Sequence, residues 1–165
     1  MLFRSIEGSI YPFNTWEDIR IHADIPLDLR VMGDEVELGR IFSNLIENAR
    51  SYGKTPGTGV TTVDISTSLH EGRVFVRVRD HGPGVSAETL PKLTRPFFRG
   101  DSARTEATGA GLGLAIVVKM VQSMGGLLRL TNSLEGTGLV ATLRLQQDIS
   151  QTTPASHRNG RRASA

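Results

Sequence analysis

The chain has 165 residues, 38% of them apolar, and no cysteine, so it can bury the core of one domain but has neither disulfide bonds nor a thiolate metal site. Its 19 basic and 17 acidic residues give a formal net charge of +2, and we expect no basic stripe on the fold and therefore no nucleic-acid partner. No apolar run approaches the roughly 20 residues of a membrane span and no signal peptide is visible, so we expect a cytoplasmic chain without direct membrane contact.

The first elements in chain order are two short strands and a helix. Residues 1–18 have mixed composition and are left without an assignment. Alternating apolar and polar residues predict a strand over 19–23, and residues 27–33 are a second candidate. Asp34 can then cap an amphipathic helix that runs to about Tyr52. The apolar stripe of this helix follows the i, i+3, i+4, i+7 spacing through Leu38, Ile41, Phe42, Leu45, Ile46 and Ala49.

The middle of the chain predicts a β-hairpin followed by a polar segment. Residues 63–69 and 74–80 alternate apolar with polar side chains on either side of a His-Glu-Gly turn. Ser86 can cap a short helix over residues 87–95. The segment RPFFRGDSARTEAT, residues 95–108, has no helical or strand period and is therefore expected to be irregular.

The last third predicts a buried helix and a closing hairpin. Residues 109–126 form a helix that is entered through glycines and stopped by two more. The hairpin comprises residues 127–131 and 139–145, and the tail 147–165 is expected to be disordered because it is short of apolar residues. The order of helices and antiparallel hairpins predicts an α+β fold with helices on one face of the sheet, over residues 19–146.

Two amides stand at one edge of the apolar stripe of the first helix. Asn44 and Asn48 lie one turn apart, and amide oxygens suit Mg²⁺, which takes further oxygens from water and nucleotide phosphates. The alternative is a surface pair that bonds water. Ser51 falls on the same edge, whereas Arg50 points about 160° away from Asn48. This edge therefore predicts a metal held by amides, with Ser51 facing the phosphates.

An aspartate ends the second strand of the first hairpin, and a glycine turn follows it in DHGPG. The carboxylate of Asp80 can accept a hydrogen bond from an amino group such as the exocyclic amine of adenine. Gly82 and Gly84 would let the ring lie against bare backbone. The alternative is a turn in which the aspartate bonds its own backbone.

A second glycine run, Gly109-Ala-Gly111-Leu-Gly113, opens the last helix. Its free N–H groups and positive dipole end predict an anion site, and the alternative is a glycine-rich hinge. From the polar segment before it, Arg99 and Arg104 could reach phosphates if the segment is a flexible lid; a solvated loop is the alternative.

In chain order, the stretches NLIENARSYG, DHGPG, RPFFRG and TGAGLGL resemble the N, G1, F and G2 boxes of sensor histidine kinases. The segment PFFRGDSART looks most like the osmolarity-sensor (EnvZ-like) branch. The resemblance covers roughly residues 28–146. It implies the Bergerat ATP-binding (GHKL) fold shared with gyrase B, Hsp90 and MutL. This fold is a two-layer α/β sandwich in which three main helices cover one face of a mixed, mostly antiparallel sheet, with a flexible lid at about residues 95–110.

The resemblance also implies a role for each matching residue. Asn48 would coordinate Mg²⁺ with Asn44 in support, Tyr52 would pack by the adenine, and Asp80 would bond its amine. The ATP site so implied comprises Asn44, Asn48, Arg50, Ser51, Tyr52, Asp80, Gly82, Gly84, Arg99, Gly100, Gly109, Ala110, Gly111, Leu112, Gly113 and Leu114.

The chain departs from the family pattern twice. Ser51 stands where family members usually have Lys or Arg, so we expect the phosphates to be held less well. None of the four histidines fits the family's phosphoacceptor, which lies on a separate dimerisation helix. We therefore expect the chain to be the catalytic domain of a larger inner-membrane sensor kinase. This domain alone should be monomeric and unable to phosphorylate itself. Its partners would be ATP or ADP, the histidine-bearing dimerisation domain and, indirectly, a response regulator.

The leading interpretation is thus a histidine kinase domain that transfers the γ-phosphoryl group of Mg-ATP to a histidine on another domain. Three alternatives remain open: a nucleotide-binding regulatory module with weak or no kinase activity, another GHKL ATPase, and a protein-interaction domain without nucleotide affinity. The last leaves the four boxes unexplained.

Overall fold

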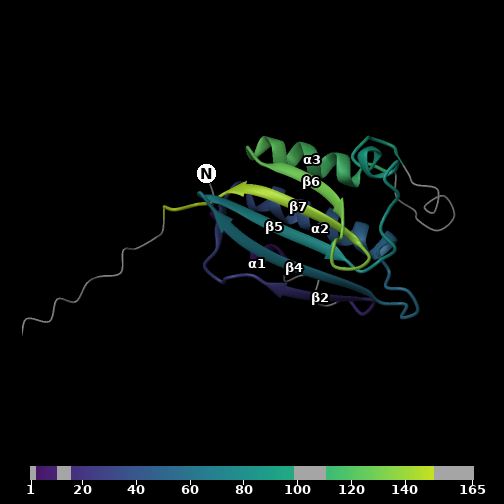
Figure 1. Cartoon of the computed structure of the whole chain (residues 1–165). Helices are drawn as coiled ribbons and strands as arrows, with labels where there is room; N and C mark the ends of the chain where they lie inside the picture. Colours follow the sequence, from purple (N-terminus) through teal and green to yellow (C-terminus); the bar gives the residue numbers. More distant parts are fainter. Residues whose placement is uncertain (1–2, 11–15, 99–110, 151–165) are drawn as a thin grey trace, which may run out of the picture.

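The computed structural model describes residues 3–10, 16–98 and 111–150, with only the backbone of residues 3–5 (Figure 1). Its centre is a five-stranded sheet in the order β2-β4-β5-β7-β6. The one parallel pair is β2 with β4, and the other neighbours are antiparallel. This is the mixed, mostly antiparallel sheet that the sequence predicts. The strands are β2 (Ile19–Asp24), β4 (Thr61–His70), β5 (Arg73–Asp80), β6 (Leu127–Asn132) and β7 (Leu139–Gln146).

The helices α2 (Glu35–Tyr52) and α3 (Gly113–Ser123) cover one face of this sheet (Figure 1). Asp34 caps α2 as expected, since its Oδ1 accepts hydrogen bonds from the N–H groups of Val36 at 2.8 Å and Glu37 at 3.1 Å. All six residues of the predicted apolar stripe are buried. They pack in one core with the inward-facing residues of the sheet, among them Val63, Ile65, Val74, Val76, Val78, Leu143 and Leu145.

The N-terminal residues that received no assignment belong to this same core. Strand β1 (Phe3–Ser5) pairs with β3 (Arg30–Met32) in a separate two-stranded sheet. Between them in sequence, the short helix α1 (Ile6–Ile10) buries Ile6 and Ile10 in the core and is the third α-helix within the described residues. The strand expected over residues 27–33 is therefore shorter and joins β1 instead of the main sheet.

Two further expectations are corrected by the structure. The helix predicted over residues 87–95 is wrong, because only a 3-10 turn, η2 (Leu90–Lys92), forms there. Pro91, in its middle, has no N–H to donate, so helical bonding cannot propagate. The tail also begins later than Gln147, because this residue bridges to Val31 and the Asp148 N–H donates to the Arg30 carbonyl at 3.0 Å.

The C-terminal elements follow the predicted order. Helix α3 ends where the two glycines were expected to stop it, as the Gly126 N–H donates to the Val121 carbonyl at 2.8 Å and Gly125 adopts a φ of 69°. The closing hairpin joins β6 to β7. Within the described residues, no helix is long and apolar enough to cross a bilayer.

Candidate functional site

A pocket lies between the inner face of the sheet and the two long helices. Helix α2 lines it with Leu45, Asn48 and Ala49, and α3 lines it with Leu114. The sheet supplies the remaining wall through Val78, Asp80, Leu130, Leu139 and Ala141. The lining is thus apolar apart from one amide and one carboxylate, and an apolar lining with a few polar groups is typical of small-molecule sites. It brings together Asn48, Asp80 and Leu114 of the residues expected from sequence.

The carboxyl group of Asp80 is buried at the end of β5 and is held by two backbone donors. Its Oδ1 accepts from the Gly82 N–H at 2.9 Å and from the Leu139 N–H at 3.1 Å. Burial raises the pKa of Asp80 above its usual range, although these two hydrogen bonds oppose the shift. In the described part of the chain no donor reaches the other oxygen, Oδ2. Asp80 lines the pocket and keeps one carboxylate oxygen without a donor among the described residues.

Three glycines allow the backbone to approach Asp80 closely. A Cβ on Gly53 would lie 2.6 Å from the Asp80 side chain, and one on Gly82 would lie 2.6 Å from the Gly53 Cα. At Gly138 it would lie 1.8 Å from the Asp80 carbonyl oxygen, and the φ of 112° is also one that favours glycine. Of these, sequence reasoning identified only Gly82. In the sequence, Gly53 is a glycine at a helix end and Gly138 a glycine in a hairpin turn. Nothing in their neighbouring residues indicates that both lie beside Asp80.

Asn132 makes a second contact between the hairpin β6–β7 and the glycine turn, and the sequence did not predict it. The side chain of Asn132 accepts from the Val85 N–H at 3.0 Å and donates to the Val85 carbonyl at 2.7 Å. The preceding Gly84 has a φ of 71°, and a Cβ there would lie 2.8 Å from the Asn132 Oδ1. Asn132 therefore clamps the turn that follows Asp80 against the end of β6. Its only sequence signal is an asparagine at the end of a strand.

The two amides of α2 face the start of α3, on the edge that the helical spacing predicts. Asn44 donates through Nδ2 to the Arg40 carbonyl at 2.8 Å, and its Oδ1 lies 3.1 Å from where a Gly113 Cβ would be. The described residues contain no cluster of three or more His, Asp or Glu side chains that could hold a metal. A divalent ion here would therefore rely on the oxygens of Asn44 and Asn48, water and a ligand's phosphates, which is a donor set that suits Mg²⁺.

Arg50 is engaged away from the pocket, so its inclusion among the nucleotide contacts is not supported. Its Nε lies 2.5 Å from the Asp18 Oδ2, and its guanidinium lies over the Trp16 ring at 4.9 Å from the centroid. This hydrogen bond lowers the pKa of Asp18. The side chain thus occupies the β2 side of the helix, as its angular position relative to Asn48 requires. The next two residues, Ser51 and Tyr52, are exposed.

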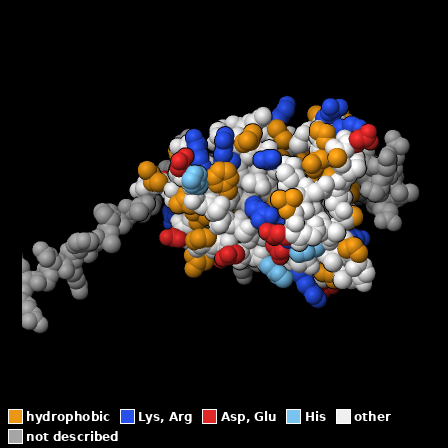
Figure 2. Space-filling model, in the orientation of Figure 1, with side chains coloured by type: hydrophobic (Ala, Val, Ile, Leu, Met, Phe, Trp, Pro, Cys, Tyr) orange, Lys and Arg blue, Asp and Glu red, His pale blue; other side chains and the backbone are white. Residues whose placement is uncertain are grey.

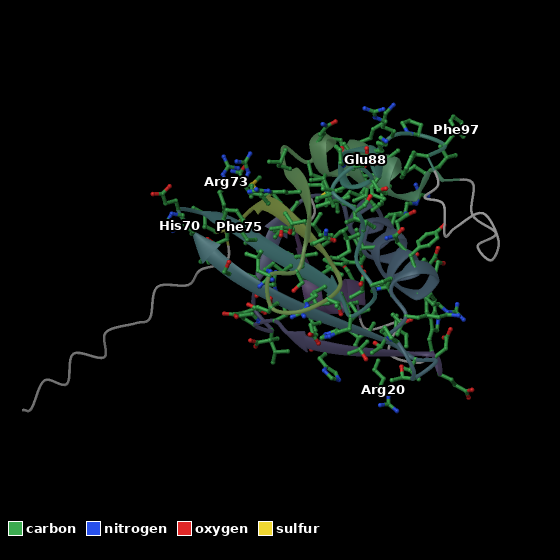
Figure 3. All side chains as sticks on the ribbon, turned by 45° about the vertical axis from the view of Figure 1, so that its right-hand side comes forward. Arg20, His70, Arg73, Phe75, Glu88 and Phe97 are labelled. Carbon is green, nitrogen blue, oxygen red and sulfur yellow. The ribbon has the colours of Figure 1, made fainter. Side chains whose placement is uncertain are left out.

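The first backbone N–H groups of α3 have no partner within the helix, as at any helix start. Among the described residues no side chain caps the helix at Leu112. Gly111 enters the helix with a φ of 71° and accepts at its carbonyl from the Phe97 N–H at 3.0 Å. The Phe97 side chain itself points outward from the domain and is 74% exposed (Figure 3). Arg99, Gly100, Arg104, Gly109 and Ala110 lie outside the described residues.

Residues 33–149 match the model of the family described as histidine kinase-, DNA gyrase B- and HSP90-like ATPases. The sensor-like histidine kinase SenX3 of Mycobacterium tuberculosis is 38% identical over 129 residues, which are 78% of this chain and 30% of the relative. The sensor histidine kinase WalK of Bacillus subtilis is 36% identical over 72% of this chain and 19% of its own length. The chain therefore spans less than a third of these two relatives.

Solved structures agree with this match. The mycobacterial sensor histidine kinase MprB superposes with a TM-score of 0.73 at 28% identity, covering 86% of this chain and 93% of that one. The kinase domain of the E. coli osmosensor EnvZ superposes with a TM-score of 0.63 at 29% identity, covering 93% and 92%. The chain belongs to the histidine kinase-, gyrase B- and HSP90-like ATPase family, with the fold of sensor histidine kinase ATPase domains, as the four boxes suggest. The EnvZ-like branch is compatible with these matches and stays a prediction.

Proposed function

We propose that this domain binds Mg-ATP and transfers the γ-phosphoryl group to a histidine on a separate dimerisation domain, in two-component signalling. The observation that carries the proposal is the acceptor at Asp80. One carboxylate oxygen is occupied by two backbone donors and Asp80 lines an apolar pocket, so the other oxygen is the one left to bond a ligand there. An adenine ring would fill the apolar space and donate its exocyclic amine to this oxygen.

The same acceptor explains selection of the base. Guanine carries a carbonyl oxygen where adenine carries the amine, so it would oppose one acceptor to another at Asp80. A site built to bond a donor discriminates strongly against a ligand that lacks it, because the buried acceptor is then left unpaired. We therefore expect adenine nucleotides to bind and guanine nucleotides to bind at least about a hundredfold more weakly.

The phosphate end of the site lies between α2 and the start of α3. Asn48, with Asn44 in support, would hold the Mg²⁺ ion, which neutralises phosphate charge and orients the γ-phosphoryl group when it is bound. The backbone N–H groups at the start of α3, which no described side chain caps, would face phosphate oxygens. Catalysis would then rest on positioning and electrostatics, because there is little covalent chemistry for the protein to perform.

The acceptor histidine would come from another domain. Of the histidines in the described residues, His22 and His70 lie on strands and His81 lies in the turn after β5, and none lies on a helix. His81 is moreover bonded to Asp64, with 2.6 Å between its Nε2 and the Asp64 Oδ2. We accordingly infer that the domain acts in trans, as the cytoplasmic part of an inner-membrane sensor kinase, and that it passes phosphate indirectly to a response regulator.

Calorimetric titration tests the binding step. The chain should bind ADP and a non-hydrolysable ATP analogue, and Mg²⁺ should improve binding of the triphosphate. Transfer from radiolabelled ATP to a supplied histidine-bearing dimerisation domain tests the chemical step. Absence of nucleotide binding would refute the proposal. Binding without transfer would instead favour a regulatory module, an alternative motivated by Ser51 in place of a cationic side chain.

A further inference from the structure

The outer face of the main sheet, meaning the face that points away from α2 and α3, gathers arginines from three neighbouring strands. Cross-strand partners project from the same face of a sheet, so the register identifies its members. Phe75 pairs with Arg144, which pairs in turn with Leu127. In the next row Arg77 pairs with Thr142, and Thr142 with Arg129. Together with Arg73, which pairs with Gln146, the face carries a basic surface that we define as Arg73, Arg77, Arg129 and Arg144.

The charge of this basic surface is not compensated. All four side chains are exposed, and in the part of the chain that the structure describes none has an ion-pair partner. Three acids in or beside the sheet pair with other side chains, since Glu135 pairs with Arg79, Asp64 with His81 and Glu71 with His70. Figure 2 shows blue side chains spread across the upper part of this face, over β5, β7 and β6.

Apolar side chains stand among these arginines. Leu127 is 48% exposed, and Phe75 is half-buried between Arg73 and Arg77 along β5. In Figure 3, Arg73 and Phe75 project close together from one end of the strand. A water-facing sheet face needs only polar residues. Guanidinium groups that match phosphate geometry, interleaved with apolar side chains on a flat surface, are instead suited to the headgroup region of an anionic bilayer.

We propose that the basic surface docks on an anionic lipid bilayer. A nucleic-acid strand would need aromatic side chains on which successive bases stack, and the rows of this surface offer only Phe75. An acidic protein would anchor a side chain in a pocket, whereas these residues stand on the pleated plane of a sheet. The proposal departs from our expectations of no basic stripe and no membrane contact. The expectation of no basic stripe is wrong, because the strand register brings the four arginines together.

Docking would leave the nucleotide pocket free, because that pocket lies on the helix-covered face of the sheet. The inference is therefore independent of the proposed kinase activity and can be tested without nucleotide. Each basic side chain near an anionic surface contributes about fivefold to binding, so removing two should weaken it about 30-fold. The attraction should also fall at high ionic strength, because the screening length shortens to a few ångströms.

The test is co-sedimentation of the full chain with vesicles of phosphatidylcholine alone or with about 30% phosphatidylglycerol, in about 0.05 M and about 0.5 M NaCl. The test variant is Arg77→Gln with Arg144→Gln. The matched control is Arg30→Gln with Lys119→Gln, which changes the net charge equally at exposed positions on β3 and α3. Arg129→Gln alone repeats the test with an expected loss of about fivefold.

The proposal predicts binding to the anionic vesicles at low salt, a loss of about 30-fold in the test variant and a loss of less than about threefold in the control. Absence of binding at low salt overturns it, and so does an equal loss in both variants. A third variant, with Arg158, Arg161 and Arg162 changed to Gln, covers the basic C-terminal sequence. If only this third variant loses vesicle binding, the C-terminal sequence is responsible and the proposal is overturned. The proposal is also overturned if the test variant binds vesicles as the wild type does but loses affinity for polyglutamate or an oligonucleotide.

Discussion

Replacement of Asp80 by Asn should separate nucleotide binding from stability. The amide oxygen can still accept from the Gly82 and Leu139 N–H groups, which lie 2.9 Å and 3.1 Å from Oδ1. The amide nitrogen then stands where Oδ2 stood and opposes a donor to the adenine amine. Loss of a hydrogen bond to a charged group costs about 1.5–3 kcal/mol, so ADP affinity should fall at least about 10- to 150-fold.

The stability of the same variant should change in the opposite direction. Burial raises the pKa of Asp80 above its ordinary value of 3.8, so the folded state is penalised for ionising this group. The stability associated with its protonation is fully present below the unfolded-state pKa and is lost as pH rises through the folded-state pKa. At pH 7 Asp80→Asn should therefore unfold at an equal or higher temperature than the wild type, and this advantage should shrink as pH falls toward 4.

The assays are calorimetric titration with ADP and thermal unfolding at several pH values. Asp24→Asn, the same substitution at an exposed position on β2, is the control and should leave affinity unchanged. If Asp80→Asn keeps ADP affinity within about threefold, Asp80 is not the adenine anchor. If it unfolds at a markedly lower temperature at pH 7, the buried carboxylate stabilises the domain and our account of its pKa is wrong.

Three further outcomes are expected. Asn132→Ala removes both hydrogen bonds to Val85, so it should lower the free energy of unfolding by about 1–2 kcal/mol and weaken ADP binding. Urea unfolding measures the first effect and calorimetric titration the second. Unchanged ADP affinity would contradict the role of Asn132 as a clamp. Ser51→Arg should improve affinity for a triphosphate, or the rate of transfer, about ten- to a hundredfold, and no gain in either would refute a phosphate-facing position. Because Arg50 lowers the pKa of Asp18, this ion pair stabilises the domain above the unfolded-state pKa of 3.8 and is lost as pH falls through the lower folded-state pKa. The difference in unfolding temperature between wild type and Asp18→Asn should therefore vanish in strong acid, and a difference that persists there would have another origin.

Local sequence patterns determined much of this domain. The apolar stripe of α2, its cap at Asp34 and the alternation in β4, β5 and β7 all depend on neighbours within one or two turns or along one strand. The glycine turn after Asp80 and the amide pair on α2 also carry short-range signals, which is why the four boxes could be identified. The helix expected over residues 87–95 failed for an equally local reason, since a cap at Ser86 cannot offset the missing N–H of Pro91.

Only the tertiary structure decided how these pieces act together. The Leu139 N–H that holds Asp80 is 59 residues away in sequence, and the Asn132 clamp on Val85 spans 47 residues. Gly138 and Gly53 matter because another segment approaches them, which no property of their own neighbours indicates. The four arginines of the basic surface are likewise joined by register alone. The periodicity of buried residues can be read within one helix or strand. A site or a charged face depends instead on atoms that are distant in sequence and that strand pairing brings close together.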